Sequence, residues 1–186
     1  MRRSDRHLGA RGGGPRPRAA RPPKHSSFEL VTANVTTGRK ISDVPRCDVL
    51  LAQELLMEAE QCASLTRNLE RQSNLVAHLN PAIRTDGGGL SSGVGVCHRP
   101  EWQATPPPDF GPFETPLPPE RAKFMIVSGL LPCGVLAISA YFYTGEDFTG
   151  RNWGLLTALG ERIRALGIPF VLGADFQNPP DALRAT

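Results

Sequence analysis

Three polar side chains follow apolar stretches of this 186-residue sequence, and their types suit metal and proton chemistry. Asn34 comes after Leu30–Ala33, Glu54 after the stretch that ends at Gln53, and Asp175 after 171–173. Carboxylate and amide oxygens bind hard cations such as Mg²⁺, and a carboxylate can take a proton from an attacking water. Since strand ends in open α/β sheets gather such side chains at one edge, we expect these three to lie close together.

Each of the three also has an ordinary structural explanation. The helix dipole favours an acid such as Glu54 in a first helical turn. Asn34 could bond its own turn, and Asp175 could be a loop carboxylate before two prolines. The metal-binding interpretation is modestly favoured for Glu54, because Gln53 stands beside it directly after an apolar strand, whereas for Asn34 the two explanations weigh about equally.

Strands alternating with helices must position these residues, which predicts the α/β class with a mixed sheet flanked by helices. Strands are predicted at 28–35, 47–52, 74–79, 94–98, 124–128, 134–141 and 168–173. Helical spacing of apolar residues predicts one helix from about Leu55 to Leu69 and another that includes Trp153 to Leu166. Gly167 is placed to end the second helix. The last strand is expected to be buried.

A proline-rich segment, 100–120, interrupts this pattern. Prolines cannot donate regular sheet hydrogen bonds, so an extended surface loop is expected. A proline-rich ligand for another domain is the alternative.

The charge is divided unevenly along the chain. Residues 1–25 contain eight basic residues and one acidic residue, a charge of +7, so the remaining residues carry −4 of the total of +3. Residues 1–27 offer almost nothing to bury and are predicted to be a disordered basic tail. Its arginines could hold nucleic acid by neutralising phosphates or direct the chain to the nucleus, but a solvated tail without function is the preferred interpretation.

The spacing of Cys47, Cys62, Cys97 and Cys133 fits neither a zinc module nor a disulfide framework. Free cysteines weakly favour a reducing, intracellular compartment, with the nucleus as one candidate. No apolar run has the length of a membrane span, so no membrane partner is expected.

Four short motifs resemble, in order, those of the endonuclease/exonuclease/phosphatase superfamily. They are Thr32-Ala33-Asn34-Val35, Leu50-Leu51-Ala52-Gln53-Glu54, Ser139-Ala140-Tyr141 and Leu172-Gly173-Ala174-Asp175-Phe176. The likeness runs from about Phe28 to the end of the chain, so 28–186 is expected to form the first part of a DNase I-like α/β sandwich, truncated before its second half.

The resemblance implies roles for five residues. Glu54 would be the main ligand of a Mg²⁺ or Mn²⁺ ion, and Asn34 would orient Glu54 or contact the phosphate. Asp175 would help to activate the attacking water, Gln177 would stabilise the pentavalent phosphate, and Tyr141 would contact a phosphate oxygen. Tyr143 would face the same side of the strand as Tyr141, but a packed aromatic is the better explanation for it.

The sequence departs from the superfamily pattern in two ways. Where the family has Gly-Asp-x-Asn, this chain has Gly173-Ala174-Asp175-Phe176-Gln177. Gln is longer than Asn by one methylene, and such a misplacement can cost about a hundredfold in rate. The family's later Asp and Ser-Asp-His motifs have no counterpart. The chain is therefore expected to be an enzyme only if completed downstream, and inactive as given.

The function expected from these features is a truncated metal-dependent phosphodiesterase, endonuclease-like and acting on nucleic acid, with retroelement origin as a further expectation. Its expected partners are nucleic acid and a missing C-terminal half or a reverse-transcriptase-type domain. The alternatives are a non-catalytic nucleic-acid-binding remnant of the same fold, and an unrelated α/β domain in which the motifs are coincidental.

Overall fold

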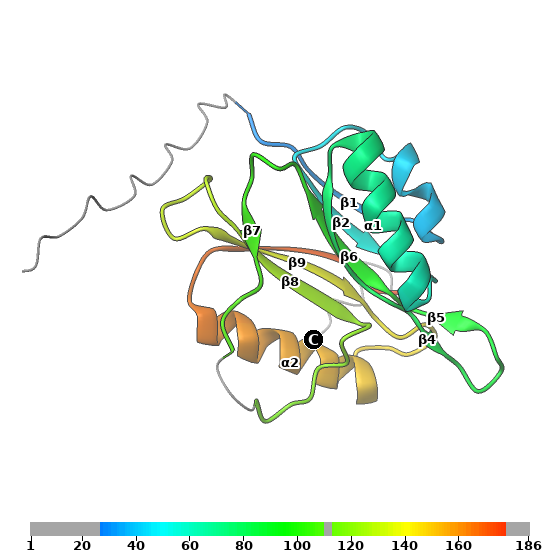
Figure 1. The fold of residues 1–186 in the computed structure, drawn as a ribbon. Helices are drawn as coiled ribbons and strands as arrows, with labels where there is room; N and C mark the ends of the chain where they lie inside the picture. The colour runs from blue at the N-terminus through cyan, green and yellow to red at the C-terminus, as the bar shows by residue number, and fades with distance from the viewer. Residues whose placement is uncertain (1–26, 110–112, 178–186) are drawn as a thin grey trace, which may run out of the picture.

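Two four-stranded sheets pack face to face at the centre of the molecule (Figure 1). The computed structural model describes residues 27–109 and 113–177. In spatial order, the first sheet contains β1 (Leu30–Asn34), β2 (Val49–Gln53), β6 (Val94–His98) and β3 (Val76–Asn80). The second contains β10 (Phe170–Asp175), β9 (Val135–Tyr141), β8 (Ala122–Val127) and β7 (Ala104–Thr105). A short hairpin of β4 (Ile83–Arg84) and β5 (Leu90–Ser91) projects beside them.

Helices cover the outer faces of both sheets. The short 3₁₀ helix η1 (Gly38–Asp43) and α1 (Ala59–Ser73) lie on the first sheet, and α2 (Gly150–Leu166) lies on the second (Figure 1). The order of layers is therefore helix, sheet, sheet, helix, which is the layered architecture that the α/β pattern predicts. No helix among the described residues is both long and apolar enough to cross a membrane.

The strand pairing brings four strand ends to one edge. β1 runs parallel to β2, and β10 runs parallel to β9, while the other neighbours in both sheets are antiparallel. Asn34 is in register with Gln53 in the first sheet, and Asp175 is in register with Tyr141 in the second. Because β1 and β2 contact β10 across the interface between the sheets, the two parallel pairs end near each other.

Gly173 allows the sheets to approach closely at this place. A Cβ atom there would lie 2.5 Å from Thr32 Oγ1 and 2.8 Å from Leu51 Cδ1. Real Cβ atoms do not come so close to their neighbours, so the glycine is required by the close approach of β10 to β1 and β2.

The α/β class, the first half of a DNase I-like sandwich and the main strands are confirmed. The start of the first helix was predicted wrongly. Glu54 and Leu56 have left-handed backbones, with φ of 58° and 48°, so the chain turns after β2 and α1 begins only at Ala59. Gln61 completes a capping box with Glu58 at that start. Gly167 ends α2 in the left-handed conformation, as predicted.

Two burial predictions were also wrong. The spacing placed Trp153 on the apolar face of its helix, but it is 55% exposed, and the buried face of α2 contains Asn152 and Leu155 instead. The final strand was expected to be buried, yet Phe170 and Val171 are exposed because β10 is the edge strand of its sheet. The segment 100–120 contains the short strand β7, and the tail at 1–27 lies, apart from Ser27, outside the described residues.

Candidate functional site

Three strands of the candidate site end in the same way. Just past β1, β2 and β10, a non-glycine residue takes a left-handed backbone: Thr36 (φ 53°), Glu54 (φ 58°) and Gln177 (φ 56°). Such conformations are uncommon outside glycine and cost energy. They turn the chain sharply at the shared edge, where β1, β2 and β10 end.

Asn34 and Asp175 meet directly across the two sheets. The amide Nδ2 of Asn34 donates to Asp175 Oδ2 at 2.5 Å. The other oxygen of each side chain closes a turn of its own, since Thr36 N donates to Asn34 Oδ1 at 2.9 Å and Gln177 N donates to Asp175 Oδ1 at 3.0 Å. The structure therefore fixes the two side chains against each other, 141 residues apart in sequence.

Glu54 and Tyr141 form the second contact of the site. The Tyr141 hydroxyl lies 3.4 Å from Glu54 Oε1 and donates to it. Burial raises the pKa of Tyr141, and the negative charges of Glu54 and Asp175 raise it further, against the lowering effects of a side-chain hydrogen bond with Thr144 and the positive charge of Arg121. Tyr141 thus lies within electrostatic range of both carboxylates, which connects the two contacts into one cluster.

Gln53, to which the sequence assigned no role, is a buried glutamine that forms hydrogen bonds with both sheets next to this cluster. Gln53 is 2% exposed, and its Nε2 lies within hydrogen-bonding distance of Leu51 O (3.0 Å), Ser139 Oγ (3.1 Å) and Gly173 O (3.1 Å). Its Oε1 accepts from Thr32 Oγ1 at 3.3 Å.

This network joins β1, β2, β9 and β10. The Ser139 hydroxyl adds a bond of 2.7 Å to Ala52 O. A polar residue at the end of an otherwise apolar buried strand was the available signal for such a role, because buried polar groups are normally hydrogen-bonded.

The donor set fits a divalent cation that keeps most of its water ligands. Among the described residues, no three His, Cys, Asp or Glu side chains are arranged to hold a metal ion. Mg²⁺ needs only one or two carboxylates besides water and substrate phosphate. Glu54 and Asp175, with the amide of Asn34, are oxygen-bearing groups of that kind, so these residues fit the ion implied by the resemblance, although its presence stays a prediction.

The remaining predicted residues differ in how they reach the cluster. Gln177 contacts Asp175 through its backbone N–H, so a role for its side-chain amide stays a prediction. Ala174 causes no irregularity in the strand, since it pairs in register with Ala140 and packs in the core under α2. Tyr143 is half-buried, and the guanidinium carbons of Arg121 and Arg151 lie 4.0 Å and 4.2 Å from its ring centroid.

Comparison with solved structures identifies a similar fold. The chain superimposes on the crystal structure of ANGEL2, a 2′,3′-cyclic phosphatase in complex with adenosine-2′,3′-vanadate, with a TM-score of 0.55 and 13% identity. The DNase I-like α/β fold is shared. The match covers 82% of this chain and 54% of that one, so the chain spans about half of its neighbour. No family model and no curated protein matches this sequence.

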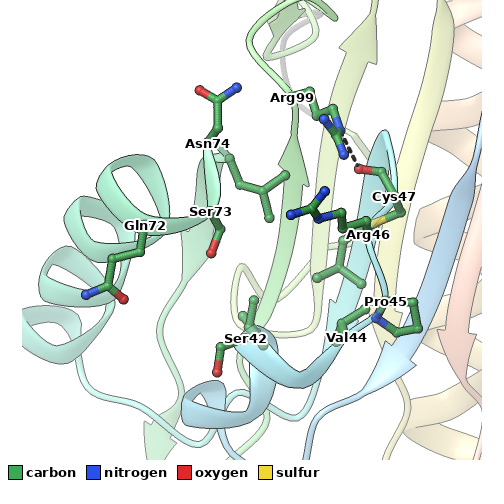
Figure 2. A pocket seen from close by; sticks show the side chains of 12 residues that line it. Ser42, Val44, Pro45, Arg46, Cys47, Gln72, Ser73, Asn74 and Arg99 are labelled. Carbon is green, nitrogen blue, oxygen red and sulfur yellow. Dashed lines mark hydrogen bonds between the residues drawn. The ribbon is translucent and has the colours of Figure 1, made fainter.

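A pocket of about 480 Å³ lies at the other end of the first sheet (Figure 2). It is lined by residues before β2 and at the end of α1, and Arg46 and Arg99 both border it. Arg99 Nε lies 3.8 Å from Asp48 Oδ1 and donates to Cys47 O. The partial negative charge of the α1 C-terminus further offsets the two cations. The pocket is therefore separate from the strand-end cluster.

Proposed function

We propose that this chain provides the metal-binding and phosphate-binding part of a divalent-metal-dependent phosphodiesterase that acts on nucleic acid. One observation supports this most strongly: two carboxylates, an amide and a tyrosine hydroxyl come together at the ends of β1, β2, β9 and β10. The fold shared with ANGEL2 supports phosphodiester chemistry of the same general kind. The basic tail favours nucleic acid as the substrate.

Asp175 is suited to accept a proton from water. Both of its oxygens already accept one hydrogen bond, from Asn34 and from the Gln177 backbone. A carboxylate has about four lone-pair positions, so acceptor capacity remains. These two bonds fix its orientation, which is what a general base needs in order to meet a water molecule in line with a phosphorus atom.

Glu54 and Asn34 would hold a Mg²⁺ ion, which leaves Asp175 available as the base. The bound ion would neutralise charge on the phosphate and polarise its oxygens. The Tyr141 hydroxyl would donate to a non-bridging phosphate oxygen when substrate replaces Glu54 as its acceptor. Water would then form the new P–O bond and its proton would pass to Asp175, while the P–O bond to the leaving oxygen breaks and the departing alkoxide takes a proton from solvent.

Hydrolysis assays test this proposal. The full chain would be incubated with Mg²⁺ and, separately, with single-stranded DNA, duplex DNA, RNA and adenosine 2′,3′-cyclic phosphate. Any cleavage of a nucleic acid by this chain should require the metal and should fall about a hundredfold or more in Glu54→Gln, because the ion is worth several kcal/mol of transition-state stabilisation. Glu60→Gln, at an exposed position on α1, is the matched control. Cleavage that is equal in both variants, or absent from the intact chain, would contradict an active enzyme.

A non-catalytic nucleic-acid-binding role is the second candidate, supported by the charge of +7 in residues 1–25. It predicts salt-sensitive binding of DNA or RNA that disappears when residues 1–27 are deleted. The same binding with and without the tail would reject this candidate.

A further inference from the structure

The pocket of about 480 Å³ on the first sheet has two arginine side chains on one side and the end of α1 on the other (Figure 2). Arg46 lies in the segment between η1 and β2, and Arg99 directly follows β6. The two segments are held together, because Arg99 N donates to Asp48 O at 3.0 Å and Arg99 Nε donates to Cys47 O at 3.1 Å. The fold therefore brings two like charges to one cavity.

These two cations are only partly neutralised within residues 27–109 and 113–177. Asp48 is the carboxylate nearest to Arg99, with Oδ1 at 3.8 Å from Nε, and its other oxygen accepts from Glu29 N at 2.8 Å. Asp48 and the roughly −0.5 charge of the α1 C-terminus offset Arg99 in large part. In the same part of the chain, no carboxylate forms an ion pair with Arg46. An anion in the pocket would therefore gain an unpaired guanidinium as its partner.

The rest of the lining offers an apolar wall and several neutral polar groups. Ile41, Val44 and Leu75 form the aliphatic part of the lining. The neutral polar side chains, which both donate and accept hydrogen bonds, are Ser42, Gln72, Ser73 and Asn74. Pockets of this volume hold small organic molecules, and a few polar groups among apolar ones fix the orientation of the ligand. The pocket is thus larger than a lone phosphate requires.

We propose that this pocket binds a nucleotide, either free or as one unit of a single-stranded nucleic acid. Its phosphate would pair with Arg46 and with the terminal nitrogens of Arg99, since guanidinium groups form charge-assisted hydrogen bonds with phosphate oxygens. The base would bury apolar surface against the aliphatic wall, and the sugar hydroxyls would bond the polar side chains at the end of α1.

This inference does not depend on the proposed hydrolysis. The pocket residues lie before β2 and after β6, whereas the cluster of Asn34 and Asp175 lies where β1 and β10 end. The two sites therefore share no residue, and backbone amides report on each of them separately.

An NMR titration of the ¹⁵N-labelled full chain without metal tests the proposal. The probes are adenosine 5′-monophosphate, adenosine, inorganic phosphate and a short single-stranded oligonucleotide of adenosine. We expect the monophosphate or the oligonucleotide to shift the amides of Arg46, Asn74 and Leu75 until saturation. Tighter binding of the monophosphate would assign the site to a free nucleotide, and tighter binding of the oligonucleotide would assign it to a strand. Adenosine and inorganic phosphate should each bind about tenfold or more weakly, because each lacks one set of contacts.

Arg46→Gln removes the unpaired cation at an exposed position and should weaken binding by about tenfold. Arg67→Gln removes the same charge from an exposed site on α1 outside the pocket, so it is the matched control and should leave the affinity unchanged. Three results would overturn the proposal: no saturable shift at the pocket amides with either nucleotide probe, equal binding of adenosine and its monophosphate, or equal affinities for the Arg46→Gln and Arg67→Gln variants. Shifts confined to the amides of Asn34 and Asp175 would place the ligand at the cluster and overturn it too.

Discussion

The replacement Gln53→Leu tests whether the buried amide holds the two sheets together beneath the candidate site. Gln53 has two N–H protons and one carbonyl, so it can make about two donated bonds and one accepted bond within its network. At about 1 kcal/mol net for each bond, Leu should reduce the free energy of unfolding by about 3 kcal/mol. That is a large part of the total stability of a domain, and for this size it lowers the Tm by roughly 6–12 °C.

Urea unfolding of the two proteins provides the measurement. Trp102 is 2% exposed, so its fluorescence reports unfolding. The midpoint should fall in Gln53→Leu while the m-value stays constant, which separates a loss of stability from a change in the unfolded state. Gln72→Leu, at an exposed glutamine on α1, is the matched control and should change stability by less than about 0.5 kcal/mol. A change equally small in Gln53→Leu would refute the bridging role.

Two further predictions concern packing and pH. Gly173→Ala should reduce the free energy of unfolding by roughly 1–3 kcal/mol, because the new Cβ would overlap Thr32. Adding Thr32→Ala to the same chain should recover part of the lost stability, measured as Tm in thermal unfolding. Equal Tm values for Gly173→Ala and the parent would contradict the tight sheet contact. His78 and His98 face each other with Nε2 atoms 3.2 Å apart, and burial, His98 and Lys123 lower the pKa of His78. The folded state therefore disfavours the protonated imidazole. The stability associated with a neutral His78 should be fully present above about pH 6.5, and it should decline as the pH falls below that value and the unfolded state binds a proton more readily than the folded state. His78→Phe should flatten the pH dependence of the urea midpoint between pH 5 and 7, and an unaltered slope would contradict this origin.

The sequence predicted the strands better than it predicted what lies between them. Apolar runs such as Val49–Gln53 identify buried strands directly, and their order places polar ends at one edge. The start of α1 was predicted wrongly because Leu55, Leu56 and Ala59 have the right spacing for a helix. Instead, Leu55 is buried in an irregular turn that contains the left-handed residues Glu54 and Leu56, and Leu55 N donates to Gly93 O. Periodicity alone cannot distinguish a buried turn from the first turn of a helix.

The sequence predicted that Asn34, Glu54 and Asp175 would lie close together, but it did not predict which of these side chains form hydrogen bonds with one another. The Asn34–Asp175 hydrogen bond depends on how closely β1 and β10 approach, which follows from Gly173 and from the network of Gln53. Neither feature has a local sequence signal that reveals its partner.

The most direct test of the proposed metal site is the binding of Mn²⁺ to the full chain, in which both tyrosines are replaced by a fluorinated tyrosine. The ¹⁹F signal of Tyr141, assigned by comparison with Tyr143→Phe, follows the binding. The Tyr141 hydroxyl lies 3.4 Å from Glu54 Oε1. A paramagnetic ion held by Glu54 should therefore broaden that signal at low Mn²⁺ concentration. Mg²⁺ should reverse the broadening by competition, and Glu54→Gln should abolish it while the control Glu60→Gln keeps it. If the Tyr141 signal stays sharp in the parent chain, or broadens equally in Glu54→Gln, the strand-end cluster does not bind a divalent metal through Glu54.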